Sequence, residues 1–140
     1  MRTNGRGALI VLCVALLATP AAASILISIS RATQQMSVQV DGYPMYTWAV
    51  STGAGRLGTP AGTFRPQRMA RQWYSSMYYN SPMPYSIFFH RGYAIHGTNA
   101  INRLGGPASH GCIRLHPQNA ATLFDLVQRD GMANTLIVIH

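Results

Sequence analysis

One short stretch, Ser109-His110-Gly111-Cys112-Ile113-Arg114-Leu115, contains the residue types of a nucleophilic site. The thiolate is the reactive form of cysteine, and a free thiol with a pKa of about 8.5 ionises at neutral pH when positive charge or oriented N–H dipoles lie nearby. His110 and Arg114 each lie two residues from Cys112 and can supply that field. We therefore predict that Cys112 is a nucleophile that reacts as its thiolate.

A second histidine, His96 in the run Ile95-His96-Gly97-Thr98, precedes the thiol by 16 residues. This separation allows a loop that brings the imidazole back to the sulfur. Cysteine paired with a distant histidine is the arrangement for acyl transfer, in which the imidazole takes the thiol proton and later gives it to the leaving amine. We predict that His96 is this base.

Two further features of the cysteine stretch bear on acyl transfer. Gly111 has no Cβ and permits a tight turn, and the backbone N–H groups of Gly111 and Cys112 are the predicted oxyanion donors, each typically worth about 3 kcal/mol. Arg114 is the candidate partner for a substrate carboxylate. His110 either tunes the thiol, positions substrate or braces the turn, and Ser109 is a supporting residue.

An orienting group is expected on the other ring nitrogen of a catalytic histidine. A carboxylate is disfavoured there, because Asp41 belongs to a predicted hairpin turn and Asp125 and Asp130 belong to a predicted helix. A backbone carbonyl close to His96, such as that of Gly97, is then the expected partner.

Three segments together resemble the signature of the L,D-transpeptidase catalytic domain, the YkuD family. They are His96-Gly97-Thr98, the stretch from Ser109 to Leu115, and Gly58-Thr59-Pro60-Ala61-Gly62-Thr63-Phe64. The similarity runs from about residue 25 to about residue 139. It implies a mainly β fold, a β-sandwich of mixed sheets with one amphipathic helix packed after the cysteine loop. It also implies a backbone carbonyl behind the histidine and acylation of the thiol by carbapenem-type β-lactams.

The expected reaction is attack by Cys112 on the carbonyl between an L-centre and a D-residue of a peptidoglycan stem peptide. The resulting thioester reacts with the amine of a second stem peptide, so no cofactor is expected. Three alternatives stay open. The acyl group could instead be transferred to water, to a D-amino acid or to a protein amine. The chain could also be a wall-binding module without catalysis, or it could hold a metal ion. The zinc-type side chains are His90, His96, His110, Cys112 and His116, whose spacing matches no compact zinc module.

The first residues have the pattern of a secretory signal peptide. Arg2 and Arg6 precede an apolar run over residues 8–18, and small residues follow up to Ala23. We predict a signal peptide over residues 1–23 and export to the periplasm or cell wall. The apolar run is short for a membrane span, so no stable membrane insertion is expected after cleavage.

Cleavage leaves one predicted catalytic domain over residues 24–140 and discards Cys13; an uncleaved anchor or a lipoprotein is the alternative. The remaining chain has one cysteine, which excludes an internal disulfide. Nine arginines and three aspartates remain, for a net charge of +6. The partner is therefore expected to be anionic, and export favours wall peptides and acidic polymers over nucleic acid.

Apolar alternation predicts strands over residues 25–30 and 36–40, and the hairpin signal at Asp41-Gly42 predicts a further strand over 43–50. Further strands are predicted over 87–89 and 93–95, the second ending at His96. Residues 120, 123, 124 and 127 have helical spacing, which predicts an amphipathic helix from Pro117 to Gly131, before a buried strand over 135–139.

Two connecting segments have open interpretations. Residues 51–63 form a glycine-rich loop, which is either a simple connector or one wall of the substrate groove. Arg65, Arg68 and Arg71 then precede aromatic and methionine residues that run to Tyr85. Arginines with aromatics bind anions through charge and stacking; the alternative is a solvated basic flank beside an aromatic satellite core. This segment can also form a flap over the site, with Tyr85 as a substrate-binding or supporting residue.

Overall fold

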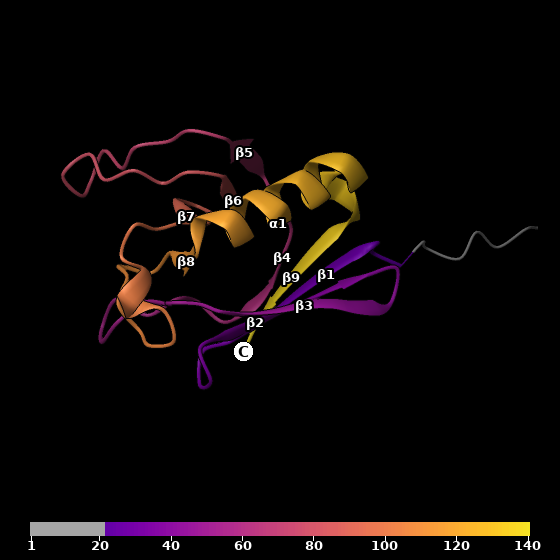
Figure 1. Cartoon of the computed structure of the whole chain (residues 1–140), viewed down its shortest axis with the longest axis horizontal. Helices are drawn as coiled ribbons and strands as arrows, with labels where there is room; N and C mark the ends of the chain where they lie inside the picture. The colour runs from indigo at the N-terminus through magenta and orange to yellow at the C-terminus, as the bar shows by residue number, and fades with distance from the viewer. Residues whose placement is uncertain (1–21) are drawn as a thin grey trace, which may run out of the picture.

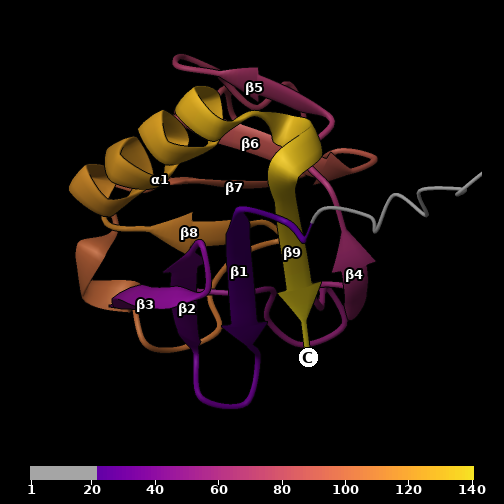
Figure 2. The ribbon, with the colours of Figure 1, turned by 90° about the vertical axis from the view of Figure 1, so that its right-hand side faces the viewer.

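The computed structural model of the chain describes residues 22–140, so nearly all of the predicted signal peptide lies outside the described residues. The described chain forms two sheets and one α-helix (Figures 1 and 2). Sheet A has the order β3-β2-β1-β9-β4 and sheet B the order β5-β6-β7-β8. No helix among residues 22–140 has the length and apolar character needed to cross a membrane.

The bounds of the elements are as follows. Sheet A contains β1 (Ile25–Ser30), β2 (Gln35–Val40), β3 (Tyr43–Ala49), β4 (Gly62–Phe64) and β9 (Thr135–Ile139). Sheet B contains β5 (Arg68–Ala70), β6 (Ser86–His90), β7 (Tyr93–Gly97) and β8 (Ile113–Leu115). The helices are α1 (Pro117–Asp130) and the short 3-10 helices η1 (Ile101–Arg103) and η2 (Met132–Asn134).

Both sheets are mixed, as predicted. Strands β1, β2 and β3 form an antiparallel meander whose turn has positive φ at Asp41 (50°) and Gly42 (81°). Strand β9 then returns parallel to β1, and β8 lies parallel to β7 in the other sheet. The mainly β class with mixed sheets and one helix is confirmed.

The main core lies between the sheets and is closed by α1. Period-two alternation buries Ile25, Ile27 and Ile29 of β1, and the helical period buries Leu123 and Phe124 of α1 against them. Figure 2 shows α1 crossing above sheet A beside β6 and β7. The helix begins at Pro117 and ends before Gly131, as predicted from the sequence.

Sheet B separates the core from the site by the same alternation. Its inner face places Ile87, Ile95 and Ile113 in the main core. Its outer face carries the alternating residues Phe88, Ala94, His96 and Arg114, with Cys112 packed beside Ala94. A one-residue slip of β7 or β8 would therefore bury the site in the core.

Residues 71–85, here called the flap, form a long extension between β5 and β6. Backbone hydrogen bonds close it like a hairpin, from Met83 N to Trp73 O (2.7 Å) and from Ser75 N to Ser81 O (2.9 Å). Figure 1 shows it reaching over the end of the molecule where β7 and β8 lie. The flap therefore belongs to the surroundings of the outer face of sheet B.

Candidate active site

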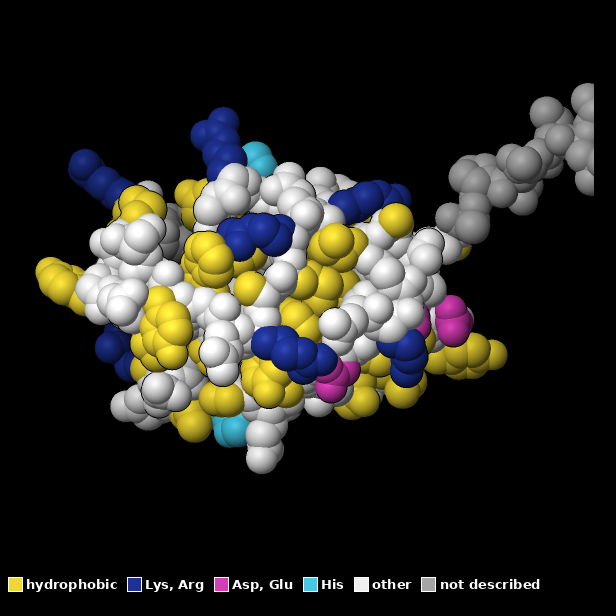
Figure 3. Space-filling view, turned by 90° about the horizontal axis from the view of Figure 1, so that it is seen from above, with side chains coloured by type: hydrophobic (Ala, Val, Ile, Leu, Met, Phe, Trp, Pro, Cys, Tyr) yellow, Lys and Arg dark blue, Asp and Glu magenta, His cyan; other side chains and the backbone are white. Residues whose placement is uncertain are grey.

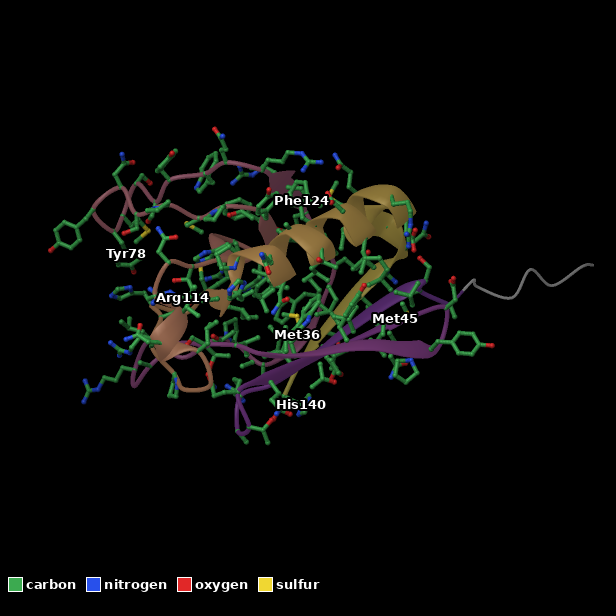
Figure 4. All side chains as sticks on the ribbon, in the orientation of Figure 1. Met36, Met45, Tyr78, Arg114, Phe124 and His140 are labelled. Carbon is green, nitrogen blue, oxygen red and sulfur yellow. The ribbon has the colours of Figure 1, made fainter. Side chains whose placement is uncertain are left out.

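A cavity of about 690 Å³ lies between the outer face of sheet B and the flap. His96, Cys112 and Arg114 line it from the sheet, and flap residues from Trp73 to Met83 line it from the other side. In Figure 4, Tyr78 of the flap and Arg114 of β8 lie at the same end of the molecule. The cavity contains both residues predicted to carry the chemistry.

The parallel pairing of β7 and β8 brings His96 and Cys112 together. His96 is in register with Arg114, and Cys112 lies two residues earlier on the same side of the chain. Strands lie about 4.8 Å apart with a rise of about 3.3 Å per residue, so the two Cα atoms are roughly 8 Å apart. That separation allows the imidazole and the thiol to meet above the sheet.

The backbone fixes the tautomer of His96. Its Nδ1 lies 2.7 Å from the carbonyl oxygen of Gly97, which is the backbone partner expected from the sequence. A carbonyl oxygen only accepts hydrogen bonds, so Nδ1 carries the hydrogen and donates it. The lone pair is then on Nε2, where a proton can be accepted.

Burial keeps the His96 imidazole neutral. Only 6% of the residue is exposed, and desolvation lowers its pKa to about 4, against the opposing hydrogen bond to Gly97 and with a smaller contribution from the Arg114 charge. At neutral pH the ring is therefore an available base. Its protonated form would be more acidic than an ordinary imidazolium and a ready proton donor.

The ionisation state of Cys112 differs from the sequence prediction. Burial raises the pKa of the thiol above its ordinary value, and the Ala94 amide and the Arg114 charge offset only part of this effect. The prediction of a thiolate sustained by His110 and Arg114 is therefore wrong for the free protein. The thiol is protonated, and its reactivity depends on proton removal by a base.

Buried hydroxyl groups hold the cysteine loop in place. Ser109 Oγ donates to the carbonyl of Cys112 and accepts from the Gly111 N–H at 3.0 Å. Thr59 Oγ1 donates to the Gly111 carbonyl at 2.7 Å and accepts from the Gly53 N–H at 2.9 Å. The Thr59 segment thus braces the loop from behind, and none of residues 51–63 lines the cavity.

This network changes the expected oxyanion donors. The Gly111 N–H is occupied by Ser109 Oγ, so the prediction that it faces an oxyanion needs correction. Among residues 22–140 the Cys112 N–H donates to no protein group, and it remains available as a donor. Gly111 is instead required for space and conformation: its φ is +121°, and a Cβ there would lie 2.2 Å from Cε1 of Tyr93.

The other predicted site residues divide into two groups. His110 lines the cavity and stacks on Tyr78 of the flap, with ring centroids 4.1 Å apart and planes at 8°. Tyr85 lies away from the cavity lining and makes an edge contact with Phe124 of α1. The contact of Tyr78 with His110 and that of Tyr93 with Gly111 have no signal in the sequence, because both are made across the fold.

The histidines that raised the possibility of zinc are dispersed in the described part of the chain. Between residues 22 and 140, no three His, Cys, Asp or Glu side chains are placed to hold a metal ion. His90 lies near the rings of Phe64 and Tyr93. His116 caps α1, where its Nδ1 accepts from the Gln118 N–H at 3.2 Å.

The lowered pKa of His96 makes a prediction about stability. Between its ordinary pKa of 6.5 and about 4, the unfolded chain binds a proton at this position that the folded chain does not. The contribution of His96 to the free energy of unfolding should therefore have its full value above pH 6.5. The free energy of unfolding should fall by roughly 3 kcal/mol as the pH is lowered to about 4. Urea unfolding of wild type and His96→Gln at several pH values should show the extra loss in wild type alone; parallel profiles would contradict it.

Comparisons with known proteins agree on one family. The model of the L,D-transpeptidase catalytic domain (YkuD) matches residues 24–139. Probable L,D-transpeptidase YbiS of Escherichia coli K12 is 46% identical over 43 residues, which cover 31% of this chain and 14% of that protein. The chain thus spans a small part of this curated relative.

Solved structures show the same fold. An L,D-transpeptidase from Xylanimonas cellulosilytica superposes with a TM-score of 0.72 at 26% identity, covering 87% of this chain and 63% of that one. L,D-transpeptidase 3 from Mycobacterium tuberculosis, in complex with a faropenem-derived adduct, gives a TM-score of 0.73 at 19% identity, covering 84% and 60%.

Proposed function

Because this chain belongs to the L,D-transpeptidase catalytic domain family, we propose that it transfers acyl groups between peptidoglycan stem peptides through a thioester on Cys112. The observation that carries the proposal is that the Cys112 thiol and the His96 imidazole line one cavity. Nδ1 of that imidazole is held by Gly97, which leaves Nε2 for the thiol proton.

In the first half-reaction, Nε2 of His96 takes the proton from Cys112 as Sγ attacks the peptide carbonyl. The Cys112 N–H stabilises the oxyanion that forms. Since the pKa of His96 is about 4, its imidazolium readily gives the proton to the departing amine. The C–N bond then breaks, and the acyl group remains as a thioester.

In the second half-reaction, an amine of another stem peptide attacks the thioester carbonyl. His96 takes a proton from the attacking nitrogen, and the C–S bond breaks as the new C–N bond forms. The proton then returns to Sγ, which restores the thiol. No oxidant, metal or nucleotide is needed, because a thioester is reactive enough towards amines.

The proposed setting is outside the cytoplasm. Residues 1–23 would direct export and be removed, and residues 24–140 would act in the periplasm or cell wall. The positive charge of the chain suits stem peptides, which carry carboxylates. The donor and acceptor peptides are the proposed partners.

The test is incubation of the purified protein with stem tetrapeptides, followed by mass spectrometry of the products. We expect dimers formed with loss of the terminal D-residue, which are the products of 3-3 crosslinking. Tripeptides alone would show that water is the acceptor and that the protein is a carboxypeptidase. Binding without any product would overturn the enzymatic proposal in favour of a wall-binding module.

A further inference from the structure

Arg68 is held in a corner between two aromatic rings at the edge of the cavity. Its guanidinium carbon lies 3.9 Å from the ring centroid of Phe88 and 4.4 Å from that of Trp73. The two rings meet edge to face, at 80°. A guanidinium stacked on ring faces is fixed in orientation while its N–H groups stay free at its edge. Arg68 lines the cavity, so those donors are available there.

The chain has no carboxylate side chain for this guanidinium. It contains three acidic residues, none of them glutamate. Asp125 and Asp130 each contact another arginine, and Asp41 lies in the turn between β2 and β3 of the other sheet. Figure 3 shows arginine side chains over the face that carries the flap and α1, with few acidic side chains among them. Any anion that binds Arg68 would therefore come from outside the chain.

The neighbouring arginines of the same segment are engaged elsewhere. Arg65 donates to the backbone carbonyl of Ala133 at 2.9 Å. Arg71 donates to Gln128 at 2.8 Å and lies 3.4 Å from Asp125. Among the side-chain hydrogen bonds of residues 22–140, none involves Arg68. It is the member of this group that faces the cavity.

A single row across sheet B connects Arg68 to the nucleophile. Arg68 pairs with Phe88, Phe88 pairs with Ala94, and the parallel register continues the row to Cys112. Three strand spacings of about 4.8 Å place the Cα atoms of Arg68 and Cys112 roughly 14 Å apart. The guanidinium reaches back over Phe88, which leaves roughly 10 Å. This is about three residue lengths of extended peptide.

We propose that Arg68 binds a carboxylate of the wall peptide, two or three residue lengths from the carbonyl that Cys112 attacks. Arg68 is then a specificity-determining residue that selects peptides with a free carboxylate over those in which this group is an amide. The nature of the peptide rests on the proposed function. Arg114 has a different place, opposite His96 at the reacting centre.

The test measures binding without turnover. Two stem peptides that differ only in a free carboxylate or its neutral amide at this distance are titrated calorimetrically into the Cys112→Ala protein. We expect the amide to bind roughly tenfold more weakly, in line with a charge-assisted hydrogen bond at a partly exposed site. Adding Arg68→Gln should reduce this preference to about twofold or less, whereas Arg71→Gln, the matched control, should preserve it.

The source of the carboxylate follows from the two half-reactions of the protein with Cys112 intact. If Arg68→Gln loses the preference for the free carboxylate in single-turnover acylation, the carboxylate belongs to the donor peptide. If the preference is lost only in the transfer of the acyl group to the amine, the carboxylate belongs to the acceptor peptide. Equal preference with and without Arg68, or no preference at all, would overturn the proposal. If the protein binds the peptide with the free carboxylate selectively but transfers no acyl group, the proposed function is contradicted and the role of Arg68 in binding is still supported.

Discussion

Replacing Cys112 with serine is expected to lower the rate of acyl transfer by a factor of at least about 10⁴, comparable to loss of a nucleophile in other covalent enzymes. The reason is the weakness of the base. Burial lowers the pKa of His96 to about 4, so its Nε2 can remove a thiol proton during attack but is poorly matched to a hydroxyl, which is far less acidic. Serine has nearly the size of cysteine, so the fold should be retained.

The measurement is single-turnover acylation, followed by the intact mass of the protein. We expect wild type to gain one covalent adduct with a stem tetrapeptide and one with a carbapenem, and Cys112→Ser to gain neither. His116→Gln is the control, since this histidine caps α1 and lies outside the cavity lining. Adduct formation by Cys112→Ser at the wild-type rate would exclude Cys112 as the nucleophile.

The periodic strands and the helix were predictable because their signal is local. Strands β1 and β2 and helix α1 agree with their apolar period, and strands β6, β7 and β9 coincide with short apolar runs. Strands β4, β5 and β8 were missed, because three residues contain too little alternation to mark a strand. Their pairing depends on neighbours supplied by distant parts of the chain.

The meeting of Cys112 and His96 in one cavity was predictable, but their ionisation was not. Cys112 and His96 stand out in the sequence because a cysteine and a distant histidine are a recognisable pair for acyl transfer. Their protonation states depend on burial, which is a property of the packed fold: desolvation is the largest cause of the pKa shift at both side chains. The closeness of His110 and Arg114 along the chain predicted that Cys112 is a thiolate. In the folded protein, desolvation favours the protonated thiol instead.

The cysteine loop shows the same limit. Gly111 was expected to offer its N–H to substrate, but Ser109 Oγ takes that hydrogen bond. What the sequence does not contain is the position of Tyr93, whose ring occupies the space where a side chain at position 111 would lie. The need for glycine thus comes from a contact between β7 and the loop before β8.

Gly111→Ala is expected to be severely damaging for two separable reasons. The backbone has φ +121°, which is strained for any residue with a Cβ, and the new Cβ would lie 2.2 Å from the Tyr93 ring. Strain and overpacking each cost about 1–3 kcal/mol. We expect unfolding to become easier by roughly 4 kcal/mol and acylation to fall at least about 100-fold, because the loop that carries Cys112 must move.

Gly105→Ala is the matched control for the strain alone. Gly105 also has positive φ, +96°, but a Cβ there meets no atom within 4 Å. It should therefore lose only the strain contribution of about 1–3 kcal/mol, with little change in acylation. If Gly105→Ala and Gly111→Ala are equally destabilised, the contact with Tyr93 has no role.

Tyr93→Ala isolates the contact by removing the ring. In a double-mutant cycle, Gly111→Ala should cost roughly 2 kcal/mol less in the Tyr93→Ala background than in wild type, because only the backbone strain remains. Urea unfolding of the four proteins gives the coupling energy, and the rate of carbapenem acylation, followed by mass spectrometry, reports whether Cys112 keeps its reactivity. Additive costs would show that the loop is shaped by its own backbone, whereas coupling shows that β7 places the nucleophile through the ring of Tyr93.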